Sequence, residues 1–161
     1  MKKSEVLALI HPVSVQYDMD PLFLLALCER ESSCDESEVR LENGFYRRYS
    51  RPMAFPASTE VLFSASYGLT QVMGEVLYEL GYFGGAKDNV AALIDAYMAR
   101  PELHIEYACR LIERIKKTAT HPRQILLRYN GGGNPNYPTE VMNIYARLCR
   151  EHDRTPIESP V

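Results

Sequence analysis

The segment from Asp20 to Ser33 constrains the fold more than any other part of the chain. Asp20 followed by Pro21 is typical of a helix start, because the carboxylate can accept hydrogen bonds from the first N–H groups and proline fits the first turn. Side chains spaced three or four residues apart then share one helix face: Leu24, Leu27, Cys28 and Glu31. The sequence therefore predicts a helix over residues 21–31 whose apolar stripe ends in a carboxyl group.

Hydrophobic periodicity also predicts helices over residues 4–17, 68–80, 89–98, 101–117, 122–129 and 138–151. Pro12 is expected to kink or end the first of them, and no alternating run is long enough to indicate a strand. A chain of 161 residues, 46% of them hydrophobic, can bury the core of one domain. We expect an all-α fold, or α with a minimal β part, over residues 1–152, followed by a flexible polar tail at 153–161.

Glu31 is the residue whose position points most directly to chemistry. A carboxyl group at the end of an apolar stripe is either half-buried or lines a cleft. Burial and the negative end of its own helix both raise the pKa of such a group. A carboxyl that stays protonated near neutral pH is what a general acid requires. The alternative is a surface glutamate at a frayed helix end that pairs with a nearby arginine, and the spacing alone leaves both interpretations open.

Three short motifs lie in the order Glu31-Ser32-Ser33, Gly68-Leu69-Thr70-Gln71 and Tyr129-Asn130-Gly131-Gly132. With the upstream run Tyr17-Asp18-Met19-Asp20-Pro21, this series resembles the lysozyme-like lytic transglycosylases, the soluble lytic transglycosylase or goose-type lysozyme group. Their pattern is a catalytic Glu followed by Ser, a Gly-Leu-Met-Gln turn and a late Tyr-Asn. The resemblance runs from about residue 4 to about residue 148. It departs at Thr70, where Met is usual, and at Gly74, where Pro is common.

The resemblance implies a lysozyme-like globular helical domain with a role for each matched residue. Glu31 would be the catalytic acid and base, and Ser32 and Ser33 would position the reacting groups and substrate. The hydroxyl of Tyr129 would meet the carboxyl of Glu31 and keep it oriented and protonated. Asn130 would support its loop or touch substrate.

Two further regions are expected to hold a glycan. Gly68 has no side chain, so a ligand can approach its backbone, and Gln71, expected on the first helical turn that follows, offers a donor and an acceptor. In the family this turn lines the glycan cleft. Within the irregular stretch 34–66, Tyr46 and Arg47 would stack on sugar rings and bind carboxylates of stem peptides; the alternative is a solvated loop.

The function implied by the resemblance is that of a peptidoglycan lytic transglycosylase. Such an enzyme cleaves the β-1,4 bond between N-acetylmuramic acid and N-acetylglucosamine and leaves a 1,6-anhydromuramic product, with no cofactor. Glycosidases usually need two carboxylates, but one suffices where the C6 hydroxyl of the muramic acid is the nucleophile. A hydrolytic goose-type lysozyme, with Glu42 or Glu60 holding a water, and a noncatalytic glycan-binding or virion module are the alternatives.

Composition bears on partners and location. The formal net charge of -3 does not favour binding to nucleic acid or to an anionic membrane. No apolar run has the length of a membrane span, and no signal peptide is recognised. The resemblance implies action on glycan strands of the periplasmic cell wall, and the lack of a signal peptide suits a phage lysin or virion-associated enzyme made in the cytoplasm. We expect a monomer. The scattered histidines and the absence of a CxxC pair predict no metal site, and Cys28 and Cys109 are expected to be small buried residues.

Overall fold

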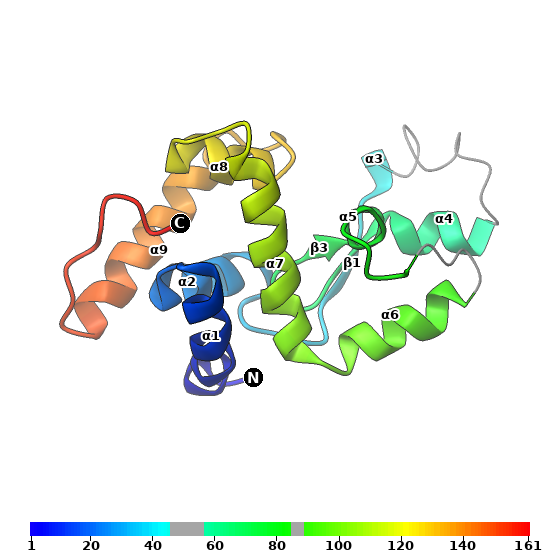
Figure 1. Cartoon of the computed structure of the whole chain (residues 1–161), viewed down its shortest axis with the longest axis horizontal. Coiled ribbons are helices and arrows are strands. Elements are labelled where there is room, and N and C mark those ends of the chain that lie inside the picture. The colour runs from blue at the N-terminus through cyan, green and yellow to red at the C-terminus, as the bar shows by residue number, and fades with distance from the viewer. Residues whose placement is uncertain (46–56, 85–88) are drawn as a thin grey trace.

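The computed structural model of this chain describes residues 1–45, 57–84 and 89–161. The described part is mostly helical and contains one small antiparallel sheet, which agrees with the predicted fold class. Helix α7 (Pro101–Lys116) stands between two groups of elements (Figure 1). One group comprises α1 (Lys3–Tyr17), α2 (Pro21–Ser32), α8 (Pro122–Tyr129) and α9 (Tyr137–Glu151). The other comprises α3 (Asn43–Phe45), α4 (Ala57–Phe63), α5 (Gly74–Glu79), α6 (Val90–Met98), β1 (Val39–Leu41), β2 (Ala65–Tyr67) and β3 (Val72–Met73).

Helix α2 lies in the middle of the first group and packs against α1 and α9. Its residues from Leu22 to Cys28 are all buried, as the apolar stripe predicts. Asp20 begins the helix as expected, because its Oδ1 accepts a hydrogen bond from the Leu22 N–H at 2.8 Å. The helix ends at Ser32, and Ser33 follows in the left-handed conformation typical of a helix C-terminus.

Residues 68–80, predicted to form one helix, form a turn, a strand and a short helix. Gly68 and Gln71 both have positive φ, at 69° and 50°, so the chain reverses between them. The reversal lets Tyr67 of β2 pair with Val72 of β3, and helical structure begins only at α5. The prediction of helix over this stretch is therefore wrong at its start, because periodicity does not register a left-handed turn.

The sheet has the order β1-β2-β3 with both pairings antiparallel. Its strands are two or three residues long, which is too short for alternation of polar and apolar residues to identify them. Helix α4 also lies in the stretch that the sequence analysis treats as irregular. Pro12 lies inside α1 and does not end it.

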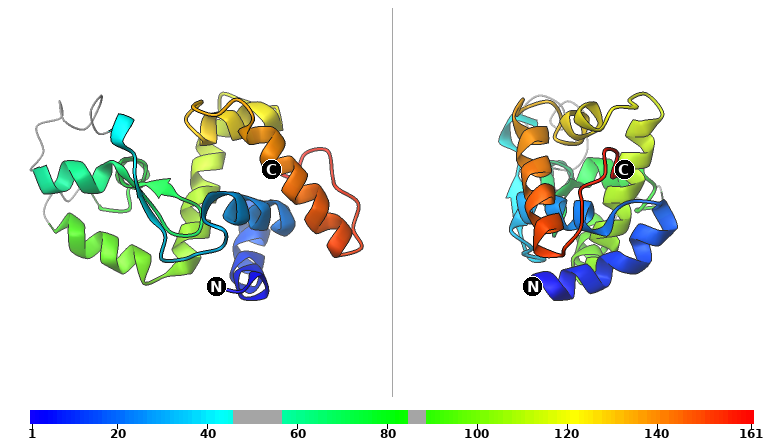
Figure 2. Two further views of the ribbon diagram at one scale, coloured as in Figure 1. Left: turned by 180° about the vertical axis from the view of Figure 1, so that it is seen from behind. Right: turned by 90° about the vertical axis from the view of Figure 1, so that its left-hand side faces the viewer.

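The C-terminal segment, predicted to be a flexible tail, folds back beside α9 (Figure 2). The backbone N–H of Asp20 donates to the carbonyl oxygen of Pro160 at 2.9 Å. Arg154 donates to the Asp20 carboxylate at 2.7 Å, and the backbone N–H of Ile157 donates to the hydroxyl of Tyr145 at 3.2 Å. These contacts tie the segment to the start of α2 and to α9.

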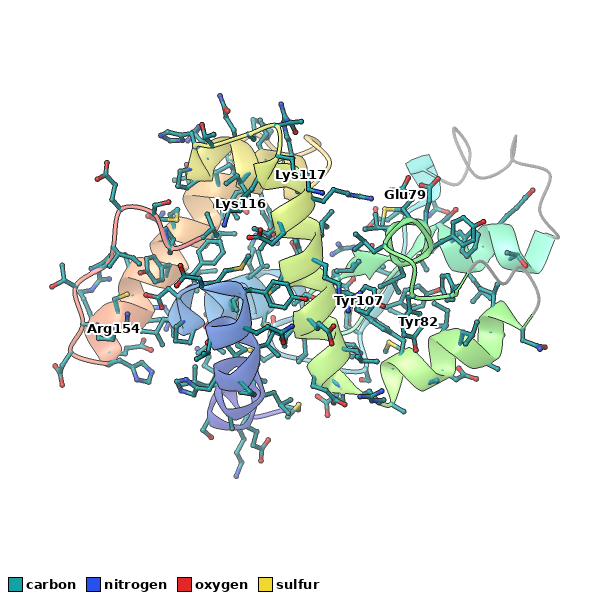
Figure 3. The ribbon with its side chains drawn as sticks, viewed as in Figure 1. Glu79, Tyr82, Tyr107, Lys116, Lys117 and Arg154 are labelled. Atoms are coloured by element: carbon teal, nitrogen blue, oxygen red, sulfur yellow. The ribbon has the colours of Figure 1, made fainter. Side chains whose placement is uncertain are left out.

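Aromatic side chains join α7 to the second group of elements. The ring of Tyr107 on α7 lies edge-on to that of Tyr82, with centroids 5.3 Å apart (Figure 3). Cys28 and Cys109 are buried, as predicted, and all four cysteines are free thiols. Within residues 1–45, 57–84 and 89–161, no helix is long and apolar enough to cross a membrane.

Candidate active site

Glu31 is in the last turn of α2 and faces a groove of about 840 Å³ between the two groups of elements. The walls come from the end of α2, β1, the β2–β3 region, α7 and the loop after α8. The Glu31 side chain is only 6% exposed, yet its carboxyl reaches the groove. The half-buried cleft position is therefore the one that the structure adopts, and the alternative of a frayed surface glutamate is not.

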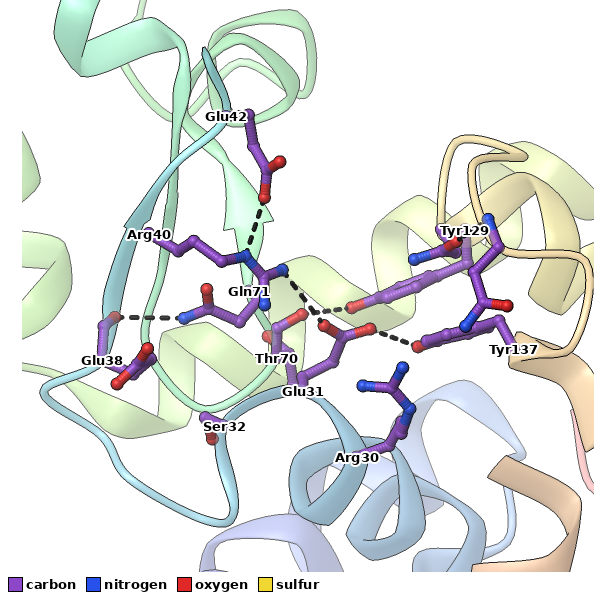
Figure 4. A network of polar contacts seen from close by, with 12 residues as sticks. Arg30, Glu31, Ser32, Glu38, Arg40, Glu42, Thr70, Gln71, Tyr129 and Tyr137 are labelled. Atoms are coloured by element: carbon purple, nitrogen blue, oxygen red, sulfur yellow. Dashed lines mark hydrogen bonds and ion pairs between the residues drawn. The ribbon is translucent and has the colours of Figure 1, made fainter. Parts of the chain in front are cut away.

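Two groups contact the Glu31 carboxyl (Figure 4). The hydroxyl of Tyr137 donates a hydrogen bond to Oε1, and the Arg40 Nη2 lies 3.8 Å from Oε2. Burial is the largest influence on this group and raises the pKa of Glu31 above its usual value, although Tyr137 and Arg40 act in the opposite direction. Glu31 thus holds its proton to a higher pH than an exposed glutamate does.

The hydroxyl of Tyr129 does not bond to Glu31, contrary to the role that the family resemblance implies. It donates to the carbonyl oxygen of Thr70 at 2.8 Å, so Tyr129 lines the groove and holds the β2–β3 turn. The tyrosine that meets the carboxyl is Tyr137, which the sequence analysis missed. The available signal was a second tyrosine just beyond the same glycine-rich loop, at the first position of α9.

Arg30 fixes the position of Tyr137. Its guanidinium lies over the Tyr137 ring, 5.4 Å from the centroid, and its Nε donates to Glu140 Oε2 at 2.6 Å. Asn130 supports the neighbouring loop, because its Oδ1 accepts a hydrogen bond from the Asn134 N–H at 3.0 Å. Both asparagines also line the groove.

Gln71 lies in the β2–β3 turn and not on a helix. Its Nε2 donates to the carbonyl oxygens of Gly68 at 2.9 Å and Glu38 at 3.1 Å, which holds the residue in its left-handed conformation. Gln71 is 7% exposed and lines the groove, and no described residue donates to its Oε1. A buried acceptor without a donor is uncommon in folded proteins. Because Oε1 has almost no exposed surface, Gln71 serves the groove by holding the turn that forms part of its wall.

The structure explains the need for glycine at position 68 differently from the prediction. A Cβ at Gly68 would overlap the ring of His104, so the missing side chain makes room for His104 and not for a ligand. Nδ1 of His104 accepts from the Leu69 N–H at 3.2 Å, and Thr70 Oγ1 donates to the His104 carbonyl at 2.7 Å. The turn is thus anchored to α7.

The two serines after Glu31 differ in their placement. Ser32 Oγ is 2.9 Å from the carbonyl oxygen of Leu69 and joins the end of α2 to the β2–β3 turn, which agrees with a positioning role. Ser33 is exposed and is not among the residues that line the groove, so the structure does not bring it into the site. Tyr46 and Arg47 lie outside the described residues.

Of the two candidate second carboxylates, only Glu42 lines the groove. Arg40 Nε donates to Glu42 Oε1 at 2.8 Å, so one guanidinium lies between Glu42 and Glu31. Glu60 is buried on α4 and is not a groove residue. No cluster of three or more His, Cys, Asp or Glu side chains that could hold a metal occurs in the described part.

Comparison with known proteins identifies no relative. No protein-family model matches the chain, and no curated protein and no solved structure matches it.

Proposed function

We propose that the protein is a glycan-cleaving enzyme of the lytic transglycosylase type, acting on the β-1,4 bond between N-acetylmuramic acid and N-acetylglucosamine of peptidoglycan. The observation that carries the proposal is Glu31: a buried carboxyl of raised pKa at the wall of a groove. This combination is typical of the general acid of a glycosidase. The choice of the β-1,4 bond and of the 1,6-anhydromuramic product rests on the motif resemblance.

In the proposed reaction Glu31 donates its proton to the glycosidic oxygen as the bond from that oxygen to C1 of the muramic acid breaks. The C6 hydroxyl of the same sugar then attacks C1 to close the anhydro ring, and its proton passes to the Glu31 carboxylate. Burial favours the protonated form of Glu31, which is the form needed before the proton is donated. Tyr137 and Arg40 stabilise the carboxylate that exists within it, because both interact more favourably with the charged form.

Other groove residues suit the binding of a sugar polymer. Tyr129, Asn130 and Asn134 add polar groups along the wall. The proposal includes a lysozyme-like fold for the mostly helical chain.

Glu42 keeps hydrolysis as the second candidate. Its carboxylate lines the groove and could activate an attacking water, which is the role of the second carboxylate in an inverting glycosidase. Its hydrogen bond to Arg40 at 2.8 Å occupies one of its oxygens, which favours the single-carboxyl mechanism.

Mass spectrometry of soluble products from purified cell wall tests the proposal. We expect 1,6-anhydromuramic ends. Glu31→Gln should lower their rate of release at least ~10²-fold, the usual contribution of a positioned acid and base, and Glu42→Gln should leave it within about threefold, below that range. Glu106→Gln is the matched control, because Glu106 is a surface carboxylate on α7, paired with Arg110 and outside the groove lining.

Other product patterns decide against the proposal in different ways. Reducing muramic ends that disappear in Glu42→Gln would make the protein a hydrolytic lysozyme. Binding to glycan without any product would make it a noncatalytic module. Normal product release by a folded Glu31→Gln protein would remove Glu31 from the chemistry.

A further inference from the structure

The groove carries a charge opposite to that of the whole chain. The chain has a formal net charge of -3. Its acidic residues are Glu31 and Glu42. Against these two, four arginines line the groove: Arg30, Arg40, Arg114 and Arg128. The raised pKa of Glu31 reduces the negative charge on this wall further. A groove with this balance attracts anionic ligands.

The arginines differ in how their charges are matched. Arg30 is paired with Glu140 at 2.6 Å, and Arg40 is paired with Glu42 at 2.8 Å. Both of these guanidiniums also lie beside the Glu31 and Tyr137 pair, where they serve the reacting carboxyl. The positive charges of Arg30 and Arg40 are therefore already balanced by carboxylates of the protein.

Arg128 is the arginine whose charge is least matched. It is exposed on α8, and its Nη1 donates to the uncharged hydroxyl of Thr118 at 2.6 Å. Among the described residues no carboxylate forms an ion pair with it. Its fork of donors is the geometry that binds a carboxylate with two parallel hydrogen bonds.

Arg114 reaches the same groove from the last turns of α7. It pairs with Glu79 of α5 at 2.6 Å, and these two side chains are 38% and 50% exposed. Ion pairs this exposed contribute little free energy, so a ligand carboxylate can compete for Arg114. Glu79 lies on α5, across from the end of α7 that carries Lys116 and Lys117 (Figure 3).

Apolar side chains lie next to these arginines on the wall. Leu111 and Ile115, one turn before and just after Arg114, both line the groove, as does Val76 of α5. An apolar wall beside two guanidiniums suits a substituent that has short alkyl groups and a carboxylate. A neutral sugar would use only the apolar part.

We propose that Arg114 and Arg128 form an anion subsite that makes the groove selective for glycan strands bearing carboxylate substituents over neutral glycans. This inference rests on the proposed function for the identity of the polymer. The subsite determines which strand binds and takes no part in the breaking of the bond.

The test measures binding separately from turnover. Glu31→Gln protein is titrated with two probes: peptide-bearing glycan strands released from purified cell wall, and an uncharged oligomer of N-acetylglucosamine. In that background, Arg128→Gln and Arg114→Gln should each weaken binding of the peptide-bearing strands about three- to tenfold, and more at low salt, where exposed charges are least screened. Binding of the neutral oligomer should change by less than about twofold, because it offers no carboxylate.

Arg110→Gln is the matched control. Arg110 is on the same helix and is paired with Glu106 at 2.6 Å, much as Arg114 is paired with Glu79, but it does not line the groove. It should leave the affinity for both probes unchanged. Arg128→Lys should retain part of the preference, because it keeps the charge and loses the fork. Melting temperatures of all variants confirm that they fold.

The outcomes separate this inference from the proposed function. Equal losses on both probes would mean that the arginines only shape the groove, and no loss on either would place them outside it; both results overturn the subsite. If the unsubstituted protein releases no product but the variants lose only the peptide-bearing strands, the subsite stands and the enzymatic proposal falls. If anhydro products form and the variants bind both probes normally, the reverse holds.

Discussion

Acid should destabilise the protein through His104, a residue outside the groove lining. The His104 side chain is fully buried on α7. Its Nδ1 accepts from the Leu69 N–H at 3.2 Å, and its Nε2 lies 3.1 Å from the carbonyl oxygen of Tyr97, to which it must donate. This pair of contacts requires a neutral ring with its proton on Nε2. A second proton would remove the acceptor for Leu69 and place a charge in the core.

The size of the effect follows from the pKa. Burial is the main cause that lowers the pKa of His104 from 6.5 to about 4, while the contact with Tyr97 acts the other way. The unfolded chain therefore binds a proton that the folded chain rejects, so the free energy of unfolding falls as pH falls from about 6.5 to about 4. Above that window His104 contributes no pH dependence. At 1.36 kcal/mol per pKa unit, the loss amounts to about 3 kcal/mol.

Urea unfolding at several pH values across this window measures the effect. His104→Asn cannot titrate, so the difference in unfolding free energy between the original protein and this variant should shrink by about 3 kcal/mol as the pH falls. Comparison at each pH cancels the titration of all other groups. His152→Asn makes the same replacement at an exposed histidine after α9 and is the matched control. A difference between His104→Asn and the original protein that stays constant with pH would refute the reasoning.

Three other substitutions test the contacts of the site and the fold. Tyr137→Phe removes the hydroxyl that stabilises ionised Glu31, so it should raise the pKa of Glu31 further and lower turnover, and an unchanged pH–rate profile would contradict this. Gly68→Ala should cost at least ~2 kcal/mol of unfolding free energy, because the added Cβ overlaps His104 at a positive φ; a loss below ~0.5 kcal/mol in urea unfolding would argue otherwise. Arg154→Ala should cost ~1–2 kcal/mol, because a buried carboxylate at the start of α2 loses its cation, and thermal unfolding beside an Arg150→Ala control measures it.

Much of the helical architecture can be predicted from local pattern. Asp20-Pro21 predicts where α2 starts. The apolar residues at helical spacing that follow predict which side chains of α2 are buried. The strands cannot be found in this way, since two or three residues carry too little pattern. They exist because a left-handed turn at Gly68 and Gln71 brings Tyr67 opposite Val72, and positive φ is not visible in hydrophobic periodicity.

The candidate site also contains residues that the sequence predicts and residues that it does not. Glu31 can be recognised as a candidate because it extends the stripe of its own helix, but spacing alone does not decide between a cleft position and a surface position. Its partner Tyr137 cannot be recognised in this way, because the two residues are 106 positions apart and meet only when α9 packs on α2. Tyr129 carries the family motif and lies in the groove, but its hydroxyl is already committed to Thr70. For Tyr129 the motif therefore predicts a place in the groove correctly but not the hydrogen bond.

Burial acts on Glu31 and His104 in opposite directions, and the two effects together set the pH range of the proposed activity. Desolvation keeps Glu31 protonated to higher pH than usual, so its capacity as an acid is lost only when the pH passes its raised pKa. Desolvation keeps His104 neutral, and the fold loses stability when the pH falls below about 6.5. The turn that carries Gln71 is anchored by His104, so binding should weaken on the acid side while proton donation fails on the alkaline side. The alkaline limit belongs to the chemistry and the acid limit to the fold, so His104→Asn should alter the acid limb of the profile and leave the alkaline limb in place.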